Sequence, residues 1–266
     1  MNFENQIRKH ARRFLPAAIR KPLGNLSGKF REYLLFPFLG LIFDLMGGSF
    51  KADGCAFTIP KDITSLQFRA CFLTGAYESD ERMLVQKYIL PEDSVLEFGA
   101  CLGIVSCITN RLLRNPTKHV VVEANPYCIP AIHRNRRRNQ AAFLVENCAV
   151  SNEVEVSFFI NPFYITGSAL QNHYQSNMPV RLPGRSLSEL NLRYGAFSVL
   201  IMDIEGSELE VLKSSAEVIG QFRLIIIELH DAIIGEQGVD ECREILLRSG
   251  FKMSERSYIS EAWLKK

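Results

Sequence analysis

Two short stretches place acidic side chains and a histidine where buried strands are expected to end. Asp203 and Glu205 follow an apolar run in "MDIEGSELEV", and Glu228 and His230 follow another in "IIIELH". Side chains alternate along a strand, so Glu228 and His230 project to the same side. Carboxylates beside an imidazole can take a proton from a hydroxyl group or hold a divalent metal ion. The spacing leaves both uses open, and we predict these four residues as catalytic without assigning a resident metal.

Each of these residues also has a structural interpretation. Acids at the start of a helix, such as Glu205 and Glu208, are favoured by the helix dipole. A single histidine at a strand end is often a hydrogen-bonded structural residue. Asp203 fits the structural interpretation least, because the preceding apolar run carries it inward, where an unpaired carboxylate is costly.

A glycine loop lies between an expected strand and helix in "VLEFGACLGI", residues 95–104. Gly99 and Gly103 let the backbone approach a ligand closely, and a helix start offers unpaired N–H groups. The dinucleotide fingerprint needs a glycine where Cys101 stands, and the carboxylate of Glu97 opposes a pyrophosphate. S-adenosylmethionine has cationic groups and no phosphate, so it suits this loop better. A plain strand-to-helix turn is the alternative.

Another acid, Glu123, ends the next expected strand, twenty residues after Gly103. At this place in an α/β sheet an acid can bind both hydroxyls of a ribose. By itself it could equally be a solvated carboxylate. With the glycine loop, it predicts a cofactor site at the carboxyl ends of neighbouring strands.

Alternating strand and helix patterns must position these residues. Runs typical of strands cover 94–98, 119–123, 143–150, 154–160, 197–206 and 223–230, and those at 119–123 and 197–206 are typical of buried strands. Helical patterns cover 78–90, 103–113 and 239–250, one helix begins near Asn125 and Pro126, and the tail resembles a strand pair turning near Ser260. This alternation predicts an α/β fold with a mainly parallel sheet.

The chain resembles the FkbM-type S-adenosylmethionine-dependent methyltransferases over roughly residues 75–250. The similar stretches are "SVLEFGACLGIVSC", "VVVEANPYCIPAIHRNRRRN", "NCAVS", "MDIEGSELEVLKSS" and "LIIIELH". The most specific feature is D-x-E-G-x-E followed by E-x-H. The resemblance implies a Rossmann-like class I methyltransferase fold. We therefore expect a mostly parallel seven-stranded sheet, with helices on both faces and a C-terminal antiparallel hairpin.

The resemblance also implies roles for individual residues. It places Glu97 and the loop glycines at the methionine end of the cofactor, Glu123 on the ribose, and residues 146–149 beside the adenine. It turns the four predicted catalytic residues toward the acceptor. The predicted cofactor-binding residues are Glu97, Gly99, Ala100, Cys101, Gly103, Glu123, Ala124, Asn147, Cys148 and Asp203. The chain departs from the family at Cys101, where Asn is usual, and at Glu97, where Asp is common.

The expected activity is methyl transfer from S-adenosylmethionine to a hydroxyl of a sugar or another small molecule. We expect the long segment 161–183, with Tyr164, Ser168 and His173, to form part of the acceptor pocket. A module that binds the cofactor without turnover is the alternative, kept open by Cys101 and by a basic N-terminal arm. A nicotinamide-dependent oxidoreductase is disfavoured by the missing glycine.

The N-terminal arm differs in charge from the remainder of the chain. Residues 1–31 contain eight Lys/Arg and one acid, whereas the remaining residues have a net charge of −5. An apolar stretch at 33–46 contains Pro37 and Asp44 and is too short to span a membrane, which takes about 20 apolar residues. We expect a helical arm at 1–50 and a methyltransferase domain at 51–266. Residues 1–46 either pack on the domain or rest on an anionic membrane.

Other sequence features bear on partners and compartment. The run "HRNRRRN" at 133–139 lacks interleaved aromatics and lies in a negatively charged body, so we do not expect a nucleic-acid partner. The seven cysteines are scattered and form no C-x-x-C pair, which favours reduced thiols and a cytoplasmic location. The N-terminal arm leaves a membrane-peripheral location open. Nothing in the sequence predicts an oligomeric state.

Overall fold

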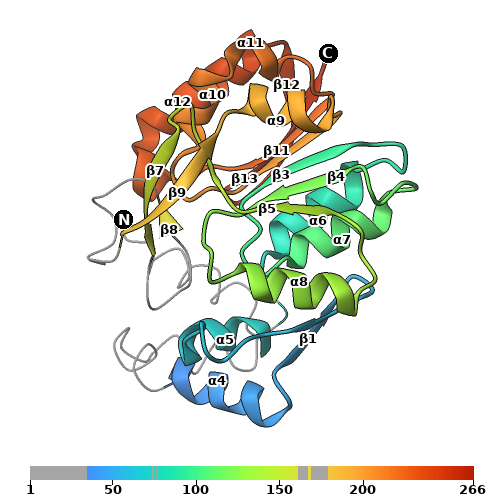
Figure 1. The fold of residues 1–266 in the computed structure, drawn as a ribbon, viewed down its shortest axis with the longest axis vertical. Coiled ribbons are helices and arrows are strands. Elements are labelled where there is room, and N and C mark those ends of the chain that lie inside the picture. Colours follow the sequence, from blue (N-terminus) through green and yellow to red (C-terminus); the bar gives the residue numbers. More distant parts are fainter. Residues whose placement is uncertain (1–34, 74, 76, 161–166, 169–178) are drawn as a thin grey trace.

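A seven-stranded sheet forms the centre of the protein. The computed structural model describes residues 35–73, 75, 77–160, 167–168 and 179–266. Five strands are parallel: β3 (Val95–Phe98), β4 (His119–Val122), β5 (Leu144–Glu146), β10 (Val199–Met202) and β11 (Leu224–Glu228). The antiparallel pair β12 (Phe251–Ser257) and β13 (Ser260–Lys265) completes the sheet, in the order β12-β13-β11-β10-β3-β4-β5. This sheet and its hairpin confirm the predicted fold (Figure 1).

Helices cover both faces of this sheet (Figure 1). One group consists of α6 (Ser79–Tyr88), α7 (Ile104–Leu112) and α8 (Ile129–Arg138). The other consists of α9 (Leu187–Tyr194), α10 (Glu208–Ser214), α11 (Ala216–Ile219) and α12 (Asp231–Arg248). The strands supply both cores because their side chains alternate: Val95 packs with the first group, and Leu96 and Phe98 pack with the second. A sheet covered on both faces explains why its strands read as continuous apolar runs.

The strand order reverses between β3 and β10. The chain runs from β3 outward to β4 and β5, then returns to place β10 on the other side of β3. Met202 of β10 pairs with Phe98 of β3, which pairs with Val122 of β4, so the three strands end at the same level. A crevice at the carboxyl ends of such strands is the usual ligand site in open α/β sheets.

Several elements differ from the sequence predictions. The expected strand at 143–150 is divided into β5 and β6 (Ala149–Val150). The segment expected as a loop up to residue 183 contains β9 (Pro179–Arg185), which pairs with β7 (Glu155–Ile160). Helix α9 was not predicted, although Ser186 and Glu189 form a capping box at its start. Helix α12 begins before the expected residue 239 because it contains two helical pieces joined at Gly235, whose φ is +73°.

A second, smaller sheet has the order β6-β9-β7-β8, where β8 is Gly167–Ser168. It contributes the buried side chain of Phe158 from β7. Of the residues expected in the acceptor pocket, Tyr164 and His173 lie outside the described residues, and only the backbone of Ser168 is described.

A helical and hairpin unit precedes the main sheet. It comprises α4 (Phe36–Leu45), β1 (Ser49–Ala52), β2 (Cys55–Thr58) and α5 (Leu66–Leu73). Asp44 of α4 binds Arg69 of α5, with 2.9 Å between Oδ1 and Nε. Strand β1 runs across residue 50, where the sequence suggested a boundary, and residues 1–34 of the arm lie outside the described chain. In the part of the chain that the structure describes, no helix is long and apolar enough to cross a bilayer.

The arginine-rich run on α8 contacts the β2 strand. Asn139 Oδ1 accepts a hydrogen bond from the backbone of Ala56, and Asn135 Oδ1 accepts one from Thr58, both at 2.8 Å. Arg138 Nη1 donates to the hydroxyl of Thr58 at 2.6 Å. At least three side chains of this run therefore attach the N-terminal hairpin to the main domain.

Candidate active site

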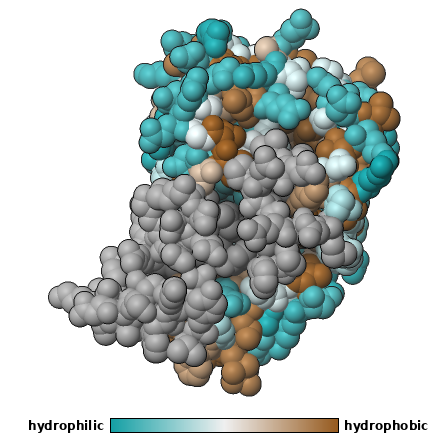
Figure 2. All heavy atoms as spheres, turned by 90° about the vertical axis from the view of Figure 1, so that its left-hand side faces the viewer, coloured by the Kyte–Doolittle hydropathy of each residue, from teal (hydrophilic) through white to brown (hydrophobic). Residues whose placement is uncertain are grey.

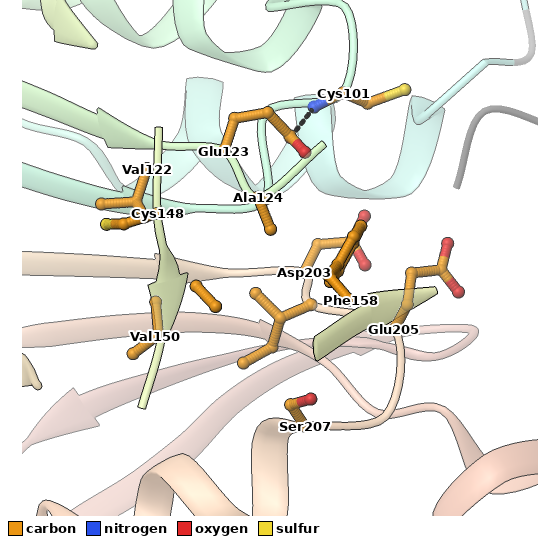
Figure 3. Close-up of a pocket in the computed structure, with 13 residues that line it drawn as sticks. Cys101, Val122, Glu123, Ala124, Cys148, Val150, Phe158, Asp203, Glu205 and Ser207 are labelled. Carbon is orange, nitrogen blue, oxygen red and sulfur yellow. Dashed lines mark hydrogen bonds between the residues drawn. The ribbon is translucent and has the colours of Figure 1, made fainter. Parts of the chain in front are cut away.

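A pocket opens at the carboxyl ends of β3, β4 and β10, where the strand order reverses. Figure 3 shows Glu123 and Cys101 on one side of it and Asp203, Glu205 and Ser207 on the other. Its lining consists of Gly99, Cys101, Val122, Glu123, Ala124, Cys148, Ala149, Val150, Phe158, Asp203, Ile204, Glu205 and Ser207. The lining described is therefore apolar apart from Ser207, the cysteine side chains and three carboxylates.

The first residue of the loop, Gly99, must be glycine because the backbone of Asp203 lies too close to it for any side chain. Gly99 has φ +87°, and a Cβ there would lie 1.6 Å from the carbonyl oxygen of Asp203. The backbone N–H of Asp203 donates to the carbonyl of Phe98 at 2.8 Å, which holds the ends of β3 and β10 together. The glycine thus lets two pocket walls meet.

Cys101 also has a left-handed backbone, with φ +48°. Among non-glycine residues, Asn is one of those that tolerate this conformation best, which gives a physical reason for the Asn that the resemblance led us to expect here. A hydrogen bond with Cys128 and burial together raise the pKa of the Cys101 thiol well above its ordinary value. The thiol therefore stays protonated at neutral pH.

Glu123 organises the glycine loop from the end of β4. Its carboxylate accepts hydrogen bonds from the backbone N–H groups of Ala100 at 2.9 Å, Cys101 at 2.7 Å and Asn125 at 2.7 Å. Burial raises the pKa of Glu123 even though these three hydrogen bonds oppose the shift. Asn147 donates its side-chain amide to the carbonyls of Glu123 and Ala124, at 2.8 and 3.1 Å. The carboxylate lines the pocket and is fixed in place.

The structure gives Glu97 a different position from the predicted one. It lies on β3 with its side chain only 1% exposed, and it is not in the pocket lining. Its carboxylate accepts a hydrogen bond from Ser106 of α7 and lies 3.1 Å from His119 Nε2 of β4. The side-chain alternation of β3 turns Glu97 into the core on the α7 side, so it braces the sheet there instead of facing a cofactor.

The imidazole of His230, next to the pocket, is surrounded by acidic side chains. From His230 Nε2, Asp203 Oδ1 lies at 3.4 Å, Glu205 Oε2 at 3.6 Å and Glu228 Oε2 at 3.9 Å. On the other side of the ring, Nδ1 lies 2.8 Å from Glu208 Oε1. The imidazole is thus surrounded by four carboxylates, and we call these five residues the acid–histidine cluster.

Burial and mutual repulsion set the charges in this cluster. Burial, followed by repulsion from Glu228, raises the pKa of Asp203 well above its ordinary value. Burial also raises the pKa of Glu205, to about 7. Burial by itself lowers the pKa of His230, but the carboxylates of Glu208 and Glu205 outweigh it and raise that pKa well above its ordinary value. The cluster therefore holds protons that the same groups would release in water.

Some residues of this region were not predicted from the sequence. Glu208 lies at the start of α10 with a fully buried side chain, and its contact with His230 is tertiary. Glu81 of α6 is 3% exposed, and its pKa is raised well above the ordinary value by burial and by repulsion from Asp203. Phe158 comes from the small sheet. Only Glu208 had a sequence signal, as the last acid of the D-x-E-G-x-E block.

The predicted residues divide into two groups. Those that line the pocket are Gly99, Cys101, Glu123, Ala124, Cys148, Asp203 and Glu205. Those outside its lining are Glu97, Ala100, Gly103, Asn147, Glu228 and His230. Ala100 and Asn147 shape the loop, as above, whereas Gly103 begins α7 with φ +73° and packs against Ile132 of α8. His230 lies next to the pocket, 3.4 Å from Asp203 and 3.6 Å from Glu205, and Glu228 lies 3.9 Å from His230.

The charged side chains of the pocket match a cationic ligand without phosphate. Its charged side chains are the three carboxylates of Glu123, Asp203 and Glu205, and no Lys or Arg is among the described lining residues. An ammonium or sulfonium group is stabilised near carboxylates, and a ribose can donate its hydroxyls to one. A pyrophosphate would be repelled here. S-adenosylmethionine therefore fits the residues present.

Comparison with known proteins agrees with this chemistry. The family model described as methyltransferase FkbM domain matches residues 97–253. No curated protein matches the chain.

The similarity to solved structures is weak. The ribosomal protein L11 methylase of Lactobacillus delbrueckii subsp. bulgaricus is 11% identical, with a TM-score of 0.44, over 70% of this chain and 77% of that one. The precorrin-6y C5,15-methyltransferase of Geobacter metallireducens GS-15 is 10% identical, with a TM-score of 0.43, over 69% and 87%. M. jannaschii TYW2 in complex with AdoMet is 10% identical, with a TM-score of 0.43, over 82% and 86%.

Proposed function

The chain belongs to the FkbM methyltransferase family and uses S-adenosylmethionine as its cofactor; from this premise we propose that it methylates a hydroxyl oxygen of a sugar or another small molecule. The observation that carries the proposal is the continuity of the pocket with the acid–histidine cluster. Asp203 and Glu205 belong to both. A hydroxyl acceptor must lose a proton when its oxygen is methylated, and this cluster supplies proton acceptors at the pocket wall.

The pocket residues divide the binding of the cofactor among them. Glu123 would accept the ribose hydroxyls with the carboxylate capacity that its three backbone hydrogen bonds leave free. The apolar wall of Cys148, Val150 and Phe158 would cover the adenine. Asp203 would face the cationic methionine end, beside Gly99.

Glu205 is the acid best placed to remove the proton of the acceptor hydroxyl. Bound S-adenosylmethionine supplies an electrophilic methyl group. Glu205 lines the pocket, and its Oε2 has no hydrogen-bond partner among the described residues. We assign Glu205 to accept the hydroxyl proton as the oxygen bonds to the methyl carbon. His230 is 2% exposed and lies behind the two lining acids, so it positions them.

A cofactor-binding module without turnover is the second candidate function. It is favoured by Cys101, which replaces the usual Asn in the loop. Titration calorimetry with S-adenosylmethionine, combined with a labelled-methyl assay over a panel of sugars and other hydroxyl compounds, separates the two. Binding with labelled product supports the enzyme. Binding with no product from any acceptor supports the module.

We further propose that the N-terminal region contacts the cytoplasmic surface of an anionic membrane. Helix α4 exposes four large apolar side chains: Phe38 (58%), Leu41 (47%), Leu45 (80%) and Met46 (71%), the last being its C-cap residue. Figure 2 shows brown spheres at the lower end of the molecule, the end at which Figure 1 places α4. The eight basic residues of 1–31 precede this helix. Apolar side chains next to a basic segment match an anionic lipid surface.

A further inference from the structure

We propose that Asp203, Glu228 and His230 bind a divalent cation of the Mn²⁺ type beside the pocket. The three residues come from the adjacent carboxyl ends of β10 and β11, so the sheet brings them together. One ligand atom from each lies within 4.8 Å of the other two. This inference deepens the proposed function. The metal site itself does not depend on that function, but the role of the ion with the acceptor does.

The spacing of these atoms fits one shared ion. Two ligands at about 2.1 Å from an octahedral ion are about 3.0 Å apart at right angles and about 4.2 Å apart when opposite. His230 Nε2 is 3.4 Å from Asp203 Oδ1 and 3.9 Å from Glu228 Oε2, within this interval. These distances are long for hydrogen bonds, so the atoms face one another without direct bonding.

Unpartnered buried atoms provide an independent indication. Asp203 Oδ1 is buried and has no hydrogen-bond partner in the described chain. Glu205 Oε2 is likewise buried without a hydrogen-bond partner among the described residues. Asp203 Oδ1 lies 3.4 Å and Glu205 Oε2 lies 3.6 Å from His230 Nε2, on a side chain that is 3% exposed. Buried polar atoms are almost always paired, so two unpaired carboxylate oxygens beside the same imidazole nitrogen indicate a binding site for a cation.

Neighbouring residues already hold the ligands in place. The Glu208 carboxylate accepts a hydrogen bond from His230 Nδ1 at 2.8 Å, which leaves the Nε2 lone pair directed at the ion. A carboxylate behind a ligating histidine is the common arrangement in metal sites. Ser260 donates its hydroxyl to Glu228 Oε1 at 2.6 Å, which leaves Oε2 available.

The ligand set and charge select the class of ion. Two carboxylate oxygens and one imidazole nitrogen suit Mn²⁺ and similar divalent ions better than soft, thiolate-preferring ones. The cluster has four carboxylates against one imidazole, so a dication reduces its surplus negative charge. Three protein ligands leave other coordination positions of such an ion open, and one of the three, Asp203, lines the pocket. An acceptor with two neighbouring oxygens, such as a sugar diol, can fill two of these open positions.

Binding of Mn²⁺ alone tests the site without reference to activity. Full-length protein freed of metal with EDTA is titrated with Mn²⁺ and followed by electron paramagnetic resonance of the free ion. We expect one tight site in the wild type, at least tenfold weaker binding in Glu228→Gln, and wild-type binding in the matched control Glu236→Gln, an exposed α12 residue. Thermal unfolding of each variant checks that it is folded, and His230→Gln provides a second ligand variant.

The outcomes separate this inference from the proposed function. Equal Mn²⁺ affinity in the wild type and in both folded ligand variants, or no binding at millimolar Mn²⁺, overturns the metal site. Methyl transfer at an undiminished rate in EDTA overturns the role of the ion with the acceptor while the proposed function stands. Specific Mn²⁺ binding with no methylation of any hydroxyl compound keeps the site and overturns the proposed function.

Discussion

Glu205 occupies an unusual backbone position for an acid at a pocket wall. Its φ is +50°, and Gly206 follows with φ +100°. A side chain on Gly206 would meet Ile233 Cγ2 at 2.3 Å, so the turn packs tightly against α12. Left-handed non-glycine residues persist only where the surroundings enforce them, and they concentrate at functional sites. The turn after β10 therefore presents Glu205 to the pocket in one fixed geometry.

Replacing this acid isolates proton removal from cofactor binding. We expect Glu205→Gln to lower kcat about 100-fold, the usual scale of general-base catalysis, because the amide is isosteric and cannot accept the proton. The Kd for S-adenosylmethionine should stay within about twofold. Labelled-methyl kinetics and calorimetry measure the two quantities, with the exposed acid Glu210→Gln as control. An unchanged kcat in Glu205→Gln would remove this residue from the mechanism.

Glu123 is the residue most directly tied to cofactor affinity. We expect Glu123→Ala to weaken S-adenosylmethionine binding about 10- to 100-fold, since hydrogen bonds to a charged group contribute about 1.5–3 kcal/mol. The same change leaves three backbone N–H groups of the loop without their acceptor. A thermal unfolding scan must therefore accompany the calorimetry, to show that the Glu123→Ala protein is folded. Wild-type affinity in a folded Glu123→Ala protein would contradict the assignment.

Two substitutions of Cys101 test whether its backbone conformation or its thiol determines stability and cofactor affinity. We expect Cys101→Asn to be tolerated, with cofactor affinity equal to or higher than wild type, because Asn accepts the positive φ. Cys101→Val should lose about 1 kcal/mol of stability, because a β-branched side chain fits a left-handed backbone worse than Cys does. Urea unfolding and calorimetry distinguish the variants. A destabilised Cys101→Asn protein would show instead that contacts of the thiol decide this position.

At the scale of elements, an ion pair fastens the strands at the end opposite the pocket. Asp93 precedes β3, Ser198 precedes β10 and Arg223 precedes β11. Asp93 Oδ1 accepts hydrogen bonds from Arg223 Nε at 2.7 Å and from Ser198 Oγ at 2.8 Å. Burial raises the pKa of Asp93, but the hydrogen bonds and the charge of Arg223 outweigh it and lower that pKa overall.

We expect Asp93→Asn to lower the free energy of unfolding by about 2 kcal/mol at neutral pH, the range for charge-assisted hydrogen bonds. The folded-state pKa lies below the ordinary value of 3.8, so this stabilisation is present above that value and is lost as the pH falls through the folded-state pKa. Urea unfolding across this interval should show the difference between wild type and variant shrinking toward acid. A difference that does not depend on pH would assign the effect to packing.

At the scale of the whole molecule, α4 is a separate surface from the active site. The helix lies at the lower end of the molecule in Figure 1, whereas the cofactor pocket lies at the carboxyl ends of the main strands. The helix packs against α5 through Gly40, where a Cβ would lie 2.0 Å from the carbonyl oxygen of Leu66. One face is thus fixed to the protein, and the other carries the exposed apolar residues.

Membrane contact is tested with the full chain on vesicles. We expect the triple variant Phe38→Ser, Leu41→Ser, Leu45→Ser to bind phosphatidylserine-containing vesicles at least tenfold more weakly than wild type, since each lost side chain removes apolar area from the interface. Leu192→Ser is the matched control, because Leu192 is 90% exposed on α9. Co-sedimentation with anionic and neutral vesicles measures binding and its charge dependence. Equal binding of the triple variant and wild type would contradict this surface.

The sequence by itself determined the strands and the acids at their ends. Strands buried on both faces are continuous apolar runs, so β3, β4, β10 and β11 were visible locally, and the acids of the predicted site follow or end these runs. Family membership and the class of cofactor also followed from such local motifs. Helix α9 was missed, although its capping-box residues are local and stand in the sequence.

Only the tertiary structure decided which acids share a site. Glu97 has the motif position of a cofactor ligand, but the packing of α7 and β4 gives it Ser106 and His119 as partners. Glu208 reads as a helix-start acid, yet it is the partner of His230 across 22 residues of chain. Phe158 reaches the pocket from a separate sheet. Side-chain contacts between distant segments depend on how elements pack, and local periodicity carries no information about that.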